Sequence, residues 1–151
     1  MRQRKFAALL MAVAWCLFAT PAWSQEAVGT IGNASGSVTV LQGGQVRPAQ
    51  AGMQLLEGDR IVTGRDSYAE IKLRDETALA LGPDGRLRIS RFRYDAETSS
   101  GTMLLTVIKG ALRVTTGLIG RRDPAAVQIR TVVGTVGIRG TQFIVEAGDR
   151  D

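Results

Sequence analysis

Short segments in which apolar and polar side chains alternate, separated by glycine-containing turns, limit more than any other feature how this chain can fold. In one of them, Ala69, Ile71 and Leu73 alternate with Glu70 and Lys72. Similar segments cover 37–41, 79–81, 86–90, 112–115, 127–130, 136–138 and 141–146. Alternate side chains of a strand point to opposite faces of a sheet, so each segment predicts a strand with one buried face. No stretch after residue 25 keeps a helical spacing, and we expect an all-β domain.

The connecting segments predict tight turns and therefore mostly antiparallel strands. Gly43 and Gly44 suit a two-residue hairpin turn that needs positive φ, and the segment 82–85 carries proline and glycine at turn positions. The alternation changes parity between Ile89 and Phe92, which indicates a β-bulge. Many short strands at close spacing are typical of a compact sandwich, a barrel or a β-solenoid.

Two segments of the chain resemble each other weakly. Residues 56–64 and 108–117 each contain an apolar residue, a charge, a glycine and then a strand that ends in threonine and glycine. Two readings stay open at this point. The segments are either repeated coils of a solenoid or two instances of ordinary hairpin composition.

The alternation also predicts which side chains form the core. We expect eight apolar residues to be buried and their alternating neighbours to be exposed. These eight residues are Ile71, Leu73, Leu112, Val114, Ile129, Ile138, Phe143 and Val145.

Residues 1–24 are typical of a helical secretory signal peptide. Three cations lie within the first five residues, and an uncharged apolar run covers 6–19. Ala22 and Ser24 are the small residues that signal peptidase reads, so we expect cleavage before Gln25. The apolar run is shorter than the roughly 20 residues of a spanning helix, so we expect no stable transmembrane anchor. The expected location is the periplasm, or the medium after secretion.

Composition limits the chemistry of the mature chain. The sequence has no histidine, and its one cysteine, Cys16, lies in the leader. Triads that contain histidine are therefore excluded, and the usual zinc and copper ligands are missing. Removing the leader's three cations from 19 basic and 14 acidic residues leaves a net charge of +2. That charge is too small to indicate a basic surface that binds nucleic acid. We expect no enzyme, no metal and no nucleic-acid partner.

The glycine-rich segment 134–141 does not predict a cofactor site. It lacks GxGxxG spacing, a lysine after its last glycine and a following helix. Glycine there instead permits close approach or sharp turning of strands. We expect no cofactor.

Four arginines lie close together in one strand-like segment, at Arg86, Arg88, Arg91 and Arg93. They form a candidate surface for an anionic partner, such as a phosphate, a polysaccharide carboxylate or an acidic protein face. The alternative is a solvated strand face whose charge prevents edge-to-edge pairing.

The last strand-like segment predicts an open sheet edge. Its residues are Thr141, Gln142, Phe143, Ile144 and Val145. We expect this strand to lack one neighbour, which residues further along or another chain would supply by β-augmentation. The alternative is that the earlier strand 127–132 already pairs there.

The order of these segments resembles the FecR domain. The segment 58–64 reads GDRIVTG, and 136–145 reads VGIRGTQFIV. Between them lie the segments 67–75, 87–89, 108–114 and 127–131. The FecR pattern likewise runs from a G-D-x-[IV]-x-T-G start to a closing V-R-G-T-x-F-x-V strand.

The resemblance implies a periplasmic all-β domain. FecR-type regulators of iron uptake join such a domain to a cytoplasmic anti-sigma segment through one transmembrane helix, and the domain receives a signal from a TonB-dependent receptor. Only five residues precede the apolar run here, so we expect a stand-alone FecR-domain protein without direct sigma-factor contact.

These observations lead to one expected organisation. The expected parts are a signal peptide over 1–24, a lead-in over 25–35, the β domain over 36–147 and a tail over 148–151. We expect a non-catalytic binding, sensing or scaffold module that recognises an envelope protein or glycan. The alternative is a structural or surface-assembly module of a longer exported system.

Overall fold

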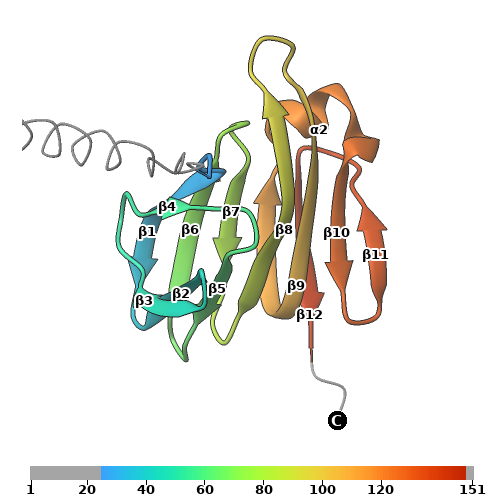
Figure 1. Ribbon diagram of the computed structural model, residues 1–151. Coiled ribbons are helices and arrows are strands. Elements are labelled where there is room, and N and C mark those ends of the chain that lie inside the picture. Colours follow the sequence, from blue (N-terminus) through green and yellow to red (C-terminus); the bar gives the residue numbers. More distant parts are fainter. Residues whose placement is uncertain (1–24, 149–151) are drawn as a thin grey trace, which may run out of the picture.

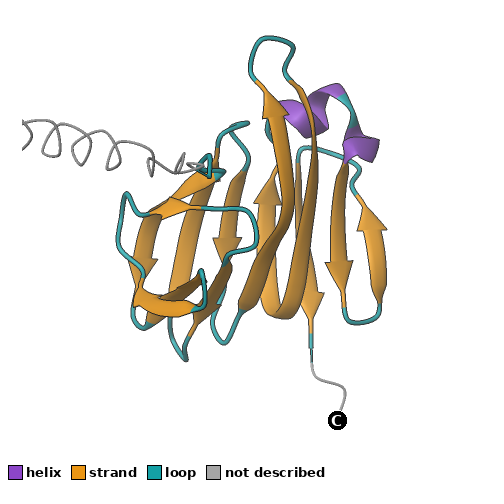
Figure 2. Ribbon diagram, viewed as in Figure 1, coloured by secondary structure: helices purple, strands orange, loops and turns teal. Residues whose placement is uncertain are grey.

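The computed structural model describes residues 25–148, which form a twelve-stranded sheet that curls over on itself (Figure 1). Strands account for most of these residues (Figure 2). The strands are β1 Gly29–Ser35, β2 Val38–Gln42, β3 Gln45–Pro48, β4 Gln54–Leu55, β5 Arg60–Thr63, β6 Tyr68–Leu73, β7 Ala78–Leu81, β8 Arg86–Asp95, β9 Ser100–Thr115, β10 Val127–Thr131, β11 Gly134–Gly137 and β12 Gln142–Ala147. A short helix α2, Leu118–Arg122, and a 3-10 helix, Pro124–Ala126, lie between β9 and β10. The all-β prediction is confirmed.

The long strand β9 belongs to both layers of the curled sheet. Its first part pairs with β8 on one edge and with β10 on the other, and its second part pairs with β7 and β12. The first layer therefore has the order β3-β2-β5-β8-β9-β10-β11, and the second has the order β4-β1-β6-β7-β9-β12. All pairings are antiparallel except that of β9 with β10.

Gly110 lies where β9 passes from one layer to the other. Its φ of +84° favours glycine, and a Cβ atom there would lie 2.7 Å from the Cα of Gly85. Gly58 in the related segment also has a positive φ, but it lies in the turn before β5. The antiparallel pairing around both glycines excludes a repeated solenoid coil, and Gly110 is a bend within one strand.

The core fills the space between the inner faces of the two layers. Six of the eight predicted core residues are buried, from Leu112 and Ile129 at 0% exposure to Ile138 at 6%. Phe143 and Val145 have the predicted face but are only half-buried, so the prediction of full burial was wrong for them. They lie on β12, which ends the second layer, and no described strand continues that layer beyond them.

Two local predictions are confirmed. Gly43 and Gly44 have φ values of +57° and +81° and close the β2–β3 hairpin. The register of β8 against β9 shifts between Ile89 and Arg91, where the bulge was expected. The expected lead-in contributes β1, which pairs with β6 and buries Ile31, so the sheet already begins at Gly29. The predicted signal peptide lies outside the described residues.

A candidate anion-binding face

The outward face of β8 carries all four arginines of the sequence-predicted cluster. Arg86, Arg88, Arg91 and Arg93 are exposed, whereas Leu87, Ile89 and Phe92 point inward and are buried. A strand without an extra residue would place Arg88 and Arg91 on opposite faces. The bulge after Ile89 inserts that residue, so the arginines on both sides of it share the outer face.

Neighbouring strands add two further arginines to this face. Arg60 of β5 lies directly opposite Arg88. Arg88 also pairs with Thr106 of β9, which in turn pairs with Arg130 of β10. Directly paired residues lie on the same face of a sheet. We call the set Arg60, Arg86, Arg88, Arg91, Arg93 and Arg130 the arginine face.

The arginine face contains few negative charges. Asp95, at the end of β8, is the carboxylate at the outward positions of β5, β8, β10 and the first part of β9. Backbone N–H groups of Thr98 and Glu97 donate hydrogen bonds to Asp95 and lower its pKa. These bonds hold the Asp95 carboxylate in the turn that follows β8. Because directly opposed like charges destabilise a sheet, the pairing of Arg60 with Arg88 is unfavourable unless an anion lies between them.

The Nε atom of Arg60 is buried without a hydrogen-bond partner. Buried polar groups in folded proteins are nearly always hydrogen-bonded, so an unsatisfied atom of this kind calls for an explanation.

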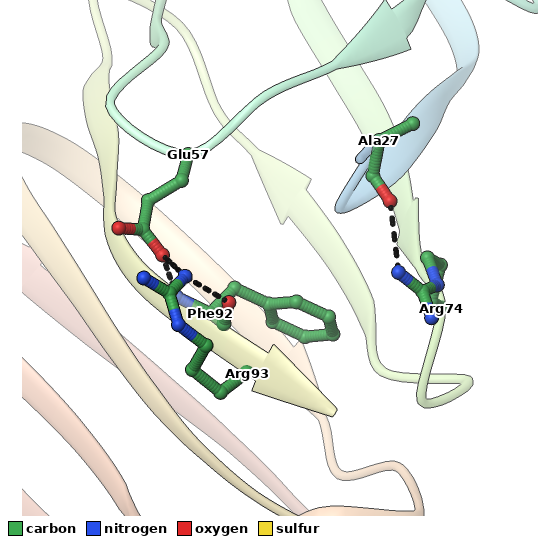
Figure 3. Close-up of polar contacts among 5 residues, drawn as sticks. All are labelled: Ala27, Glu57, Arg74, Phe92 and Arg93. Atoms are coloured by element: carbon green, nitrogen blue, oxygen red, sulfur yellow. Dashed lines mark hydrogen bonds and ion pairs between the residues drawn. The ribbon is translucent and has the colours of Figure 1, made fainter. Parts of the chain in front are cut away.

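A cavity of about 350 Å³ lies at the end of the arginine face, next to Arg93. Its walls are Gln25, Glu26, Val28, Glu57, Arg74, Phe92, Arg93 and Tyr94. Figure 3 shows the polar contacts around it: Glu57 accepts from Arg93 and from the Phe92 backbone N–H, and Arg74 donates to the Ala27 carbonyl. Arg74 also lies 2.5 Å from the Glu26 carboxylate. Both arginines of the cavity thus have carboxylate partners, which makes it a weaker anion site than the open face.

Glu57 also completes the edge of β8. The pairing of β5 with β8 reaches only Arg88, so the edge beyond it needs other partners. The backbone N–H of Phe92 donates to the Glu57 carboxylate at 2.9 Å, and the guanidinium of Arg93 donates to the Phe92 carbonyl at 3.1 Å. Side chains therefore take the place of a neighbouring strand there.

The second predicted site, the edge of β12, is open among the described residues. β12 pairs with β9 alone, while β10 pairs with β9 and β11. The alternative that the strand at 127–132 pairs with β12 was therefore wrong. The N–H of Thr116 donates to the Thr141 carbonyl, so Thr141 is a hydrogen-bonded position of the antiparallel pair. Such positions alternate along a strand, and the N–H and C=O groups of Gln142, Ile144 and Glu146 therefore point away from β9.

The described part of the chain, residues 25–148, contains no helix that is long and apolar enough to cross a membrane. Nor does it contain a group of three or more acidic, histidine or cysteine residues that could hold a metal ion.

The fold and the two candidate sites define a class: an all-β domain whose candidate functional features lie on a sheet face and a sheet edge. The chain belongs to the FecR family, because the family model described as FecR protein matches residues 59–151. That match begins just before β5 and contains all strands from β5 to β12. No curated protein and no solved structure matches the chain. FecR is an envelope-associated family, and its domain indicates a module related to envelope signalling.

Proposed function

We propose that this protein is an exported, non-catalytic FecR module that binds an anionic partner of the cell envelope through the arginine face. The observation that carries the proposal is the gathering of six arginines from three strands on one outer face, where Asp95 is the carboxylate at the outward positions and Glu57 pairs, of these six arginines, with Arg93 alone. Arginine pairs with carboxylate, phosphate and sulfate groups through two parallel hydrogen bonds, which suits such a face to anions.

A charge-matched pair of variants tests the proposal. One carries Arg86→Gln, Arg88→Gln, Arg91→Gln and Arg93→Gln. The control carries Arg47→Gln, Arg65→Gln, Arg122→Gln and Arg139→Gln, which are exposed and lie outside the face. Binding to dextran sulfate, to vesicles containing phosphatidylglycerol and to an acidic protein is measured over a salt series.

We expect the unmodified protein and the control to bind at least one of these probes, more weakly as salt rises. The β8 variant should bind at least tenfold more weakly. Equal loss in both variants would show that only net charge matters. Absence of binding to every probe would contradict the proposal and leave the solvated-face interpretation of these arginines.

A second function, surface assembly, is favoured by the open edge of β12. Ile144 on this strand is 58% exposed, and Val136 on the neighbouring edge strand β11 is 47% exposed. Val136 pairs with the buried Ile129, so it lies on the inner face of its layer. A strand added beside β12 would pair with the N–H and C=O groups of its open edge.

A further inference from the structure

A shallow hollow lies on the arginine face beside Arg91. It has a volume of about 150 Å³ and is lined by Arg91, Thr102, Met103, Leu104, Ala125, Ala126 and Gln128. Leu104 lies between Arg91 on β8 and Gln128 on β10, because it pairs with both. The 3-10 helix Pro124–Ala126 forms one wall.

We propose that the arginine face binds an acidic polysaccharide chain laid along β8, with one sugar ring seated in this hollow. The inference rests on the proposed function and specifies its partner. A sugar ring has an apolar face and a rim of hydroxyl groups. The hollow presents a matching combination: the apolar side chains of Leu104, Ala125 and Ala126, with the hydroxyl of Thr102 and the amide of Gln128 beside them.

The size of the hollow favours one ring and not a whole ligand. Pockets that enclose complete small molecules measure roughly 300–1,000 Å³, well above the volume found here. A ligand that gains affinity at this face must therefore continue beyond the hollow. The arginines extend from it in both directions along β8, with Arg93 on one side and Arg88 and Arg86 on the other.

The shape of the face favours a linear chain. From Arg86 to Arg93 the strand spans about 20–24 Å, which is much longer than a single anionic group. Arg60 and Arg130 widen the strip beside Arg88. Thr102 and Thr106 on the neighbouring β9 supply hydroxyl groups next to the arginines, as hydroxyl-rich sugars require.

The same face lacks the features that nucleic acid would need. Proteins that bind single strands combine cations with aromatic side chains on which bases stack. The two aromatic residues of β8, Phe92 and Tyr94, are at inward positions, and their rings lie tilted at 47° with 6.4 Å between centroids. No aromatic residue occupies an outward position of β5, β8, β10 or the first part of β9.

Oligogalacturonates of increasing length test the inference, because each ring carries one carboxylate. Titration of the mature protein should show affinity that rises with length and levels off once the chain covers the row from Arg86 to Arg93. The β8 four-arginine variant should lose at least tenfold in affinity for the long oligomers. Neutral dextran should not bind.

A second variant separates the hollow from the charges. Ala125→Trp fills the hollow without changing charge, and Ala96→Trp, in the exposed loop between β8 and β9, is its control. Ala125→Trp should weaken binding of the oligomers at least fivefold and leave binding of vesicles containing phosphatidylglycerol unchanged, whereas Ala96→Trp should change neither. Circular dichroism and the melting temperature check that each variant is folded.

The outcomes distinguish this inference from the proposed function. If vesicles or an acidic protein bind through the arginines and oligogalacturonates do not, the polysaccharide inference is wrong and the anion-binding function stands. Affinity that does not depend on oligomer length would also overturn the inference, because it indicates a site for a single anion. If no anionic probe binds, both are wrong.

Discussion

Phe143 and Leu112 show how the position of a strand within its layer determines how much a core side chain contributes to stability. Both point inward, but Leu112 on β9 has strands on both edges and is 0% exposed. Phe143 on β12 has one neighbouring strand and is only half-buried. The cost of truncation follows the burial that is lost and the cavity that is left behind.

Truncation of these two residues should therefore destabilise the protein to different extents. Leu112→Ala should lower the free energy of unfolding by about 3–5 kcal/mol, and Phe143→Ala by only about 1–2.5 kcal/mol. Chemical denaturation of both variants measures the difference. A cost for Phe143→Ala as large as that for Leu112→Ala would show that this ring is covered in solution, for example by self-association.

The arginine face shows what the sequence could and could not predict at single residues. The cluster on β8 was predictable because its four members lie close together in sequence and alternate with apolar residues. Arg60 and Arg130 join it only through strand pairing, which places Arg60, 28 positions away in sequence, opposite Arg88 and Arg130, 42 positions away, one strand further on. Each lies at a polar position beside a buried isoleucine, but no local pattern indicates which strands become neighbours.

Among the elements, β12 is the one whose pairing can be tested directly. Its pattern leaves the N–H groups of Gln142, Ile144 and Glu146 without a partner strand, whereas those of Phe143 and Val145 face β9. Hydrogen exchange of the monomer should therefore be fast at the first three residues and slow at the other two.

Uniformly slow exchange along β12 would show that its outer edge is covered, and the open-edge prediction would be withdrawn. The opposite edge of β9 offers an internal control, because Leu79 and Leu81 of β7 lie between β6 and β9 and should exchange slowly throughout. Adding a binding segment should slow exchange only at the outward-facing amides of β12.

Element positions were more predictable than their arrangement. Alternation located most strands because one face of each is buried, and the change of parity located the bulge. It could not indicate that β9 continues through Gly110, since a glycine within an alternating segment equally suits a turn. Nor could it choose between a sandwich and a solenoid, because that choice depends on long-range pairing such as the parallel contact of β10 with β9.

At the scale of the whole molecule, the first prediction concerns export from the cytosol. We expect mass spectrometry of protein from the cell envelope to find an N-terminus at Gln25, because the leader has a cationic start, a short apolar run and small residues at the cleavage site. Expression of a variant with Ala22→Arg should accumulate the uncleaved chain. Recovery of the intact N-terminus from the cytosol of the unmodified strain would contradict the prediction.

The passage of β9 through both layers makes the molecule a single cooperative unit. Neither layer can lose its order while the other keeps β9 intact, since four strands depend on this one for pairing. Unfolding should thus be a single all-or-none transition. A ligand that binds the folded state stabilises all of it by mass action. An anion held on the outside of the first layer therefore also stabilises the second layer against global unfolding, although it never contacts that layer.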